Sequence, residues 1–265
     1  MAYTDLDNEV VKVDAVTFDY SNAASPVIDQ LTLALKKSEI TFLIGPSGSG
    51  KTTLLKLLAG LLEPGAGDIT IQGVSLKRAN SSERRATLRK VAMTFQRSGL
   101  FDSKTVLENL IFPLQELNRL SFEKALAEAG KVLDLVELKG HESKLPHEVS
   151  GGMQKRVGIG RALALSPEVV FYDDPTAGLD PITSKNIIEL IIQIQKENKT
   201  TNLISTSDLD LAVNISRKIA SKIAFLFEGK ILQIGTADEI LGSINPVIHQ
   251  FTRGLLEGPL TKGAR

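Results

Sequence analysis

The sequence has 265 residues, of which 42% are hydrophobic and 23% charged, so it can bury one large core or two joined lobes. Lysine plus arginine and aspartate plus glutamate number 31 each, which argues against the long-range positive field that draws proteins onto nucleic acid. The absence of cysteine excludes disulfides and thiolate metal sites, and three scattered histidines are too few for a histidine cluster.

The start of the chain and its apolar stretches bear on where the protein resides. The first residues, Met-Ala-Tyr-Thr-Asp-Leu-Asp, are acidic, whereas a secretory signal is basic and then apolar. The most apolar stretches, such as residues 54–62, are interrupted by Lys56 and Gly60 and are shorter than the roughly 18–20 residues that cross a bilayer. We therefore expect a cytoplasmic protein whose role at a membrane, if it has one, comes through a partner.

The first part of the chain shows strand patterns followed by a helix. Alternation of apolar and polar residues over 10–18 predicts a half-exposed strand, and residues 31–35 repeat the pattern. Residues 40–44 are a short apolar run, typical of a buried strand, that ends in glycine. Leucines at helical spacing predict a helix over 51–62. A glycine-rich segment therefore lies between a buried strand and a helix.

The rest of the chain alternates between helices and strands. Residues 81–97 are basic and lead into an apolar strand over 91–95, and residues 106–138 have a helical pattern. The later predicted elements are a strand over 169–172, a helix over 181–197, a strand over 202–205, a helix over 209–219 and a hairpin around 228–229. This alternation predicts a mainly parallel α/β core. With no internal repeat and no long linker, we expect one domain with two lobes.

The glycine-rich segment fits the phosphate-binding motif G-x-x-x-x-G-K-[ST] in full. Its residues are Gly45, Pro46, Ser47, Gly48, Ser49, Gly50, Lys51, Thr52 and Thr53. Backbone N–H groups of such a loop turn around phosphate oxygens, the following helix points its positive end at them, Lys51 reaches the terminal phosphates and Thr52 holds Mg²⁺. An ordinary Gly/Ser turn is the alternative, but it does not require a strand before it and a helix after it. The motif predicts binding of a nucleoside triphosphate.

A second predicted strand delivers two carboxylates at its end. Asp173 and Asp174 follow the apolar run at 169–172, where ligands of open α/β sheets collect. Asp173 is the natural partner of magnesium, directly or through water. An aspartate pair could instead cap the next helix, but Asp180 and Pro181 already supply an N-cap and a first-turn proline.

Residues 149–154, Val-Ser-Gly-Gly-Met-Gln, resemble the Leu-Ser-Gly-Gly-Gln signature of ABC ATPases. Tyr20 resembles the aromatic residue that stacks on adenine in this family, Gln96 resembles the Q-loop glutamine, and residues 177–180 resemble the D-loop. The motifs occur in the family's order and span nearly the whole chain.

The resemblance implies an α/β fold with a P-loop NTPase core of the RecA type, an antiparallel β subdomain and a helical subdomain insertion. It implies a catalytic lobe of residues 1–96 and 162–240, a helical signature lobe of residues 97–161 and a C-terminal extension of residues 241–265.

The resemblance also implies that each nucleotide site is shared between two subunits. Ser150 is a good N-cap, and Gly151 and Gly152 leave bare N–H groups at a positive helix end for the γ-phosphate of ATP held by another subunit. This implies a head-to-tail dimer with ATP and Mg²⁺ at the interface, formed by two identical chains or by this chain and a paralogue. Gln96 is expected to act both in catalysis and as a magnesium contact.

Partners follow from the same resemblance. Residues 96–101 border the groove for a permease in the family, which places the protein on the inner face of the bacterial inner membrane. Residues 95–101, 106–114, 179–183 and 245–259 are similar to the ATPase of Mla phospholipid transporters, which works with a permease and an MCE-domain protein. The tail could equally be an amphipathic end that packs on its own domain.

Two departures from the family pattern affect the mechanism. Asp174 stands where the family has a catalytic glutamate, and Ser207 stands where it has a switch histidine after the strand at 202–205. A carboxylate one methylene short, by roughly 1.5 Å, leaves the attacking water badly placed, and serine lacks the reach and the protonatable ring of imidazole. We expect slow hydrolysis, or a chain paired with a fully equipped subunit. The alternative is tolerated drift with ordinary turnover.

Other functions remain open at this point. One alternative is a nucleotide-binding scaffold with degenerate hydrolysis, and another is the ATPase of an importer of amino acids or other small solutes. An ABC protein acting on DNA or ribosomes would need a long coiled coil or two cassettes in tandem, and the sequence has neither. We therefore expect no nucleic-acid partner.

Overall fold

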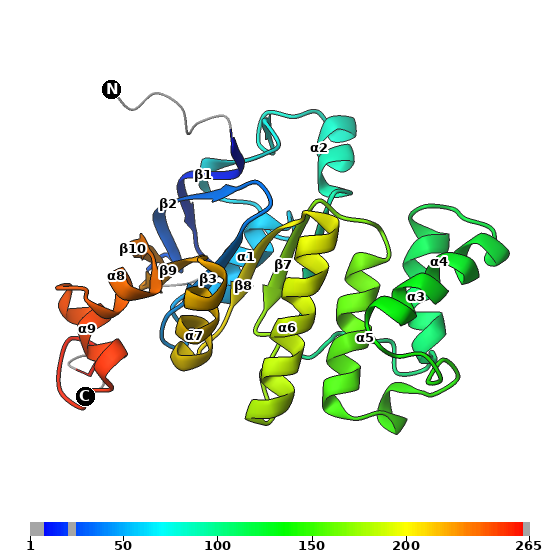
Figure 1. Cartoon of the computed structure of the whole chain (residues 1–265). Coiled ribbons are helices and arrows are strands. Elements are labelled where there is room, and N and C mark those ends of the chain that lie inside the picture. The colour runs from blue at the N-terminus through cyan, green and yellow to red at the C-terminus, as the bar shows by residue number, and fades with distance from the viewer. Residues whose placement is uncertain (1–7, 21–24, 262–265) are drawn as a thin grey trace. The chain divides into compact units, whose positions relative to one another are not determined.

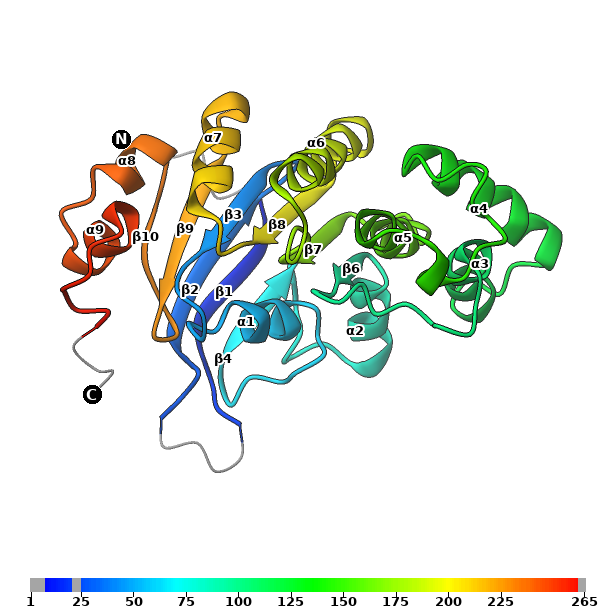
Figure 2. The ribbon, with the colours of Figure 1, turned by 90° about the horizontal axis from the view of Figure 1, so that it is seen from below.

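The computed structural model describes residues 8–20 and 25–261 of the chain (Figures 1 and 2). It divides into two compact units, the first made of residues 1–79 and 203–265 and the second of residues 80–202. The acidic start of the chain, on which part of the cytoplasmic expectation rests, lies outside the described residues. These units are defined by compactness, whereas the catalytic lobe and the signature lobe expected from the sequence are defined by their roles. The bounds of the two lobes therefore stay a prediction. Among the described residues, no helix has the length and apolar character that a membrane span requires.

An antiparallel sheet in the first unit has the strand order β2-β1-β4-β5. Val13 of β1 pairs with Leu33 of β2 on one side and with Ile69 of β4 on the other, and all three side chains are buried. Burial alternates along these strands because one face packs against the core. The bounds are Glu9–Phe18 for β1, Ile28–Lys36 for β2, Ala66–Ile71 for β4 and Val74–Ser75 for β5.

A second set of strands forms the core of the first unit. All five residues of β3 are buried, and β3 pairs in parallel with β9, which forms an antiparallel hairpin with β10. Glu228 and Gly229 have φ values of 45° and 74°, the left-handed conformation that a two-residue hairpin turn needs. The bounds are Ile40–Ile44 for β3, Thr201–Ser205 for β8, Lys222–Phe227 for β9 and Lys230–Gly235 for β10. Residues 203–205 of β8 belong to this unit.

Helices of the first unit follow these strands. Helix α1 ends earlier than residue 62, because Gly60 takes a left-handed φ of 69° that no helix continues through. In the tail, the Phe251 ring packs edge-on against Phe225 of β9, with 5.2 Å between ring centroids, so this segment packs on its own unit. The bounds are Lys51–Leu58 for α1, Leu209–Ile219 for α7, Ala237–Leu241 for α8 and Pro246–Arg253 for α9.

The second unit is mainly helical, with β6 and β7 paired in parallel. Asp180 caps α6 by accepting hydrogen bonds from the backbone N–H groups of Ile182 and Thr183, both at 3.0 Å, as its position before Pro181 predicts. The bounds are Ser81–Leu88 for α2, Val91–Thr94 for β6, Val106–Glu116 for α3, Phe122–Leu135 for α4, Gly151–Leu163 for α5, Val169–Asp173 for β7 and Pro181–Asn198 for α6, with a 3₁₀ turn at Pro146–Glu148.

Candidate functional site

The loop between β3 and α1 is shaped by its glycines. A Cβ at Gly45 would overlap the carbonyl oxygen of Leu226, so only glycine fits there. Gly48 and Gly50 have φ values of 79° and 105°, which L side chains rarely adopt. Gly50 is the N-cap of α1 and supplies no side-chain hydrogen bond to the first turn. The loop therefore offers backbone N–H groups and a helix N-terminus to an anion.

The side chains of this loop suit a phosphate ligand. The Lys51 ammonium donates hydrogen bonds to the carbonyl oxygens of Gly45 and Pro46, at 2.7 and 2.9 Å. It therefore lies along the loop that the motif predicts to bind phosphate. The Ser49 hydroxyl is buried and has no hydrogen-bond partner among the residues that the structure describes. A buried hydroxyl without a partner is costly unless a ligand or water satisfies it. These residues fit the triphosphate that the motif predicts.

Tyr20 and Ser207 also belong to the first unit. The Tyr20 hydroxyl lies 3.3 Å from the Thr53 hydroxyl, and its ring packs edge-on against Phe18, while the residue as a whole is 43% exposed. The structure thus brings the Tyr20 hydroxyl to the first turn of α1 and leaves the residue partly exposed. Ser207 is exposed and follows Thr206, whose N–H donates to the carbonyl of Leu43 in β3 at 3.1 Å.

The two aspartates of the second unit differ in conformation. Asp173 is the last residue of β7 and is buried. Asp174 has a left-handed φ of 42°, and its carbonyl oxygen accepts a hydrogen bond from the N–H of Ala177 at 3.1 Å. Left-handed conformations are several-fold more common for aspartate than for most side chains. The turn after β7 therefore tolerates aspartate at this position.

The signature segment begins a helix, as the sequence predicts. Ser150 caps α5 by accepting a hydrogen bond from the Met153 N–H at 3.3 Å. A Cβ at Gly152 would lie only 2.7 Å from the Thr183 side chain, whereas one at Gly151 would meet the Leu179 side chain at an ordinary 3.5 Å. The signature glycines thus lie against the D-loop and the start of α6, within the same unit.

Helix α5 also holds the Q-loop. The Lys155 ammonium donates to the Gln96 carbonyl oxygen at 2.5 Å, and Arg161 donates to the Ser98 carbonyl oxygen at 3.2 Å. A Cβ at Gly158 would lie 3.3 Å from Ser98, so helix and loop are in close contact between these two bonds. The Gln96 residue itself is exposed. The signature helix therefore fixes the backbone of the Q-loop at several points.

Lys155 is a functional candidate that sequence reasoning missed. It is buried, and burial lowers the pKa of its ammonium, while the negative charges of Asp174 and Asp173 partly oppose that shift. One positive group thus links the signature helix, the Q-loop and the two aspartates. The sequence does hold one sign that Lys155 is buried, because it lies four residues before the apolar Ile159, on the buried stripe of α5.

Replacing Lys155 with methionine is expected to slow phosphate release and to destabilise the second unit. Methionine keeps an apolar stem but leaves the Gln96 carbonyl without its donor, and removing a hydrogen bond to a charged group costs about 1.5–3 kcal/mol. Steady-state phosphate release and thermal unfolding measure the two effects. Lys155→Arg, which keeps the charge, should recover part of both, and equal losses in the two variants would show that the charge is not what matters.

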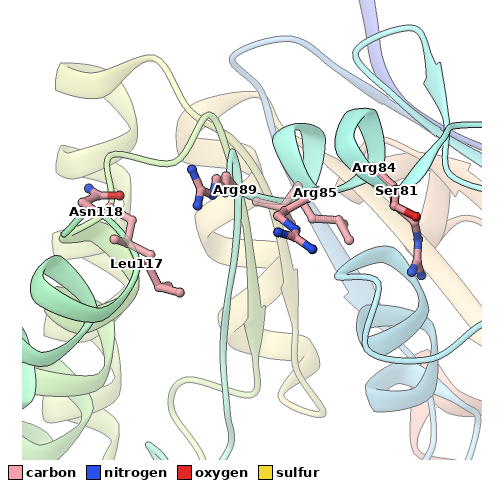
Figure 3. Close-up of a pocket in the computed structure, with 9 residues that line it drawn as sticks. Ser81, Arg84, Arg85, Arg89, Leu117 and Asn118 are labelled. Carbon is pink, nitrogen blue, oxygen red and sulfur yellow. The ribbon is translucent and has the colours of Figure 1, made fainter.

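The structure groups the predicted site residues by unit. The first unit holds Tyr20, the phosphate loop from Gly45 to Thr53, and Ser207. The second unit holds Gln96, the signature residues Ser150, Gly151 and Gly152, and the aspartates Asp173 and Asp174. The second unit also has a pocket lined by arginines of α2, and this pocket includes none of these residues (Figure 3).

Comparison with known proteins identifies relatives over most of the chain. Residues 28–177 match the family described as ABC transporter. Protein TRIGALACTOSYLDIACYLGLYCEROL 3, chloroplastic, of Arabidopsis thaliana is 36% identical over 88% of this chain and 71% of its own length. The methionine import ATP-binding protein MetN of Staphylococcus saprophyticus is 37% identical over 88% of this chain and 66% of its own length.

A solved structure shares the fold. An ATP-binding cassette determined as a dimer in a post-hydrolysis state, bound to ADP and Pi, matches with a TM-score of 0.75 and 29% identity. The match covers 86% of this chain and 98% of that chain. The expected cassette fold is thereby confirmed.

Proposed function

This chain belongs to the ABC transporter family, as the ATP-binding ATPase subunit of a transporter, and we propose that it hydrolyses Mg-ATP slowly to drive phospholipid transport. Nucleotide binding is supported by the phosphate loop, in which Gly45 admits no side chain and Lys51 lies along the loop carbonyls. Cassettes of this family dimerise and work with membrane permeases. Beyond family membership, we propose a bound Mg²⁺, a slow rate of hydrolysis, a phospholipid cargo and a set of partners for this chain.

Roles for the site residues follow from their chemistry. Lys51 and the N–H groups of the loop and of α1 would hold the phosphates, and Tyr20 would stack on the adenine. Thr52, Gln96 and Asp173 would hold Mg²⁺, which supplies charge neutralisation for phosphoryl transfer when bound. Ser150, Gly151 and Gly152 would serve the nucleotide of the opposite subunit through the positive end of α5.

The slow rate is proposed from Asp174 and Ser207. Asp174 is the candidate that positions the attacking water, and its carboxylate is one methylene shorter than glutamate. The Ser207 hydroxyl can donate one hydrogen bond but cannot carry the charge of an imidazolium. A subunit of this kind has a sound signature, so it can complete the site of a better-equipped partner. We therefore propose a dimer with a paralogue, or a slow homodimer.

The cargo and the partners are proposed from similarity. The Mla-like segments of the sequence support a phospholipid, and the plant relative has a galactolipid in its name. A permease, and with it an MCE-domain protein, would hold the chain at the inner face of the inner membrane. The second candidate is a solute importer, because the staphylococcal relative is named for methionine import.

Nucleotide-dependent dimerisation tests the shared-site proposal. We expect the purified chain to become dimeric with Mg-ATP, but not with ADP, in size-exclusion chromatography with light scattering. Gly151→Asp should abolish this dimer, because it places a negative charge where the γ-phosphate of the partner's ATP would lie. The fold has room for this side chain, since the Cβ meets Leu179 at 3.5 Å.

Gly151→Asn is the matched control, because asparagine has the same size as aspartate without the charge. It should retain more of the dimer than Gly151→Asp. If neither substitution changes the dimer fraction, the signature does not face a nucleotide in this chain. If ATP binds but the chain stays monomeric, the homodimer is excluded and the paralogue pair remains.

A further inference from the structure

The segment of residues 77–97 is far more basic than the chain as a whole. It contains seven lysines and arginines and a single acidic residue, Glu83, whereas the full sequence has equal numbers of basic and acidic residues. Some of these charges are already engaged. The Lys90 ammonium pairs with Glu168 at 3.0 Å, and the Glu83 carboxylate accepts a hydrogen bond from the Asn80 N–H at 3.1 Å in the capping box of α2. Arg85 and Arg89 are among the remaining basic residues of this segment.

A pocket of about 640 Å³ opens beside this helix, within the second unit (Figure 3). Arginines of α2 line it together with Leu88, Val91, Leu117 and Leu165. None of the described residues that line it is acidic or aromatic. Pockets of this volume hold small organic ligands. The lining thus combines positive charge with an apolar surface and offers no internal counter-charge.

Arg85 and Arg89 are the central charges of this pocket. Arg85 lies in α2, and Arg89, four residues later, is the C-cap residue of that helix. Figure 3 shows both side chains on the side of α2 toward Leu117, whereas Arg84 lies with Ser81 toward the other end of the view. Both arginines are exposed, and neither forms an ion pair with any part of the chain that the structure describes. Like charges at this spacing destabilise a helix. An external anion between the two guanidinium groups would remove that repulsion.

The apolar residues of the pocket indicate that the bound anion has an apolar group attached to it. Leu117 follows α3, and half of its surface, 50%, is exposed to solvent. Leu88 and Val91 are half-buried beside it. An exposed leucine in a pocket that Arg85 and Arg89 also line suits a ligand with an apolar body and a phosphate, because arginine binds phosphate oxygens bidentately.

We propose that this pocket binds a phosphorylated amphiphile, with the phosphate on Arg85 and Arg89 and the apolar body against Leu88, Val91 and Leu117. The pocket shares no residue with the phosphate loop and would be a second ligand site of the subunit. The absence of aromatic side chains among the described lining residues disfavours single-stranded nucleic acid, whose bases need a stacking platform. A phospholipid headgroup and a free organic phosphate have the chemistry in common.

Calorimetric titration of the full chain tests the site, with saturating Mg-ADP present to fill the phosphate loop. The probes are dihexanoyl phosphatidic acid and dihexanoyl phosphatidylcholine as monomers, glycerol 3-phosphate and inorganic phosphate. We expect the phosphatidic acid to bind at least about tenfold more tightly than the other three, because only it combines an uncompensated phosphate charge with an apolar body. If glycerol 3-phosphate or inorganic phosphate binds as tightly, the apolar part of the proposal is wrong.

The paired substitution Arg85→Gln, Arg89→Gln should weaken phosphatidic acid binding by about a hundredfold, since two charged hydrogen-bonding groups are lost. Glutamine is a good helix former, so α2 should persist, and an unchanged melting temperature and Mg-ADP affinity would verify this. Lys124→Gln, Lys131→Gln on α4 is the control, because it removes the same charge away from the pocket. Equal weakening in both pairs, or none in the arginine pair, would overturn the proposal.

Discussion

Replacing Asp174 with glutamate and Ser207 with histidine in the same chain should raise steady-state phosphate release by about a hundredfold. A misplacement of about 1 Å at a reacting centre can cost a factor of that size. Glutamate restores the missing reach toward the attacking water. Histidine restores a donor that can carry positive charge where negative charge develops on the phosphate. Phosphate release by the purified chain with Mg-ATP is the measurement.

The structure indicates that both substitutions can be accommodated. Asp174 stands in a left-handed turn with a φ of 42°, a conformation that costs glutamate more than aspartate, so the repaired chain should melt slightly lower. Ser207 is exposed, so an imidazole there meets no buried neighbours. The single variants serve as controls, since each should give only part of the gain if the two groups act on the same step.

The opposite result has an equally specific meaning. If the native chain already turns over as fast as the doubly substituted one, Asp174 and Ser207 are tolerated drift and this is an ordinary transport ATPase. If the doubly substituted chain stays slow while it still binds Mg-ATP, the limiting defect lies elsewhere. A partner subunit that completes the site would then be the next component to add.

The sequence predicted those parts of the site that are contiguous along the chain. The phosphate loop, the Ser150 cap and the Asp180 cap each depend on neighbours within a few residues, so motif and capping rules apply to them directly. Buried runs such as residues 40–44 and 169–172 were equally clear, because β3 and β7 have no exposed face. For such features, local chemistry and burial lead to the same answer.

The parts that were missed depend on tertiary contacts or on weak local signals. Lys155 meets the carbonyl of Gln96, which is 59 residues away, and nothing local to α5 predicts that bond. Helix α2 has little apolar periodicity, and only its capping box, Asn80 with Glu83, marks its start. Strand β5 has just two residues and is held by its pairing with β4. Short elements of this kind are set by their partners rather than by propensity.

Contacts within the second unit suggest how its parts act together. Helix α5 starts at the signature and holds the Q-loop through Lys155 and Arg161, with Arg161 also over the Phe101 ring at 5.4 Å. Asn109 of α3 then fixes the next segment, because its side chain bonds both the N–H and the carbonyl of Phe101, at 2.9 and 3.2 Å. A movement of the signature helix would therefore carry the whole segment that is proposed to meet the permease.

Lys51→Ala should lower the affinity for Mg-ATP by about ten- to a hundredfold, which corresponds to losing a charged hydrogen-bonding group worth about 1.5–3 kcal/mol. It should also lower phosphate release by about 100–1,000-fold, the usual effect of removing one group that stabilises transition-state charge. The loop itself should keep its shape, because its turn is set by Gly45, Gly48 and Gly50 rather than by the lysine. Calorimetry and phosphate release measure the two effects.

Lys56→Ala is the matched control, because Lys56 lies in the last turn of the same helix and has the same charge. It should leave affinity and turnover unchanged, which separates the position of the ammonium from the general loss of a positive charge. Making Lys51→Ala in the Asp174→Glu, Ser207→His chain widens the measurable range, since the native rate is expected to be low. Full affinity in Lys51→Ala, in either background, would mean that the triphosphate is not held by this loop.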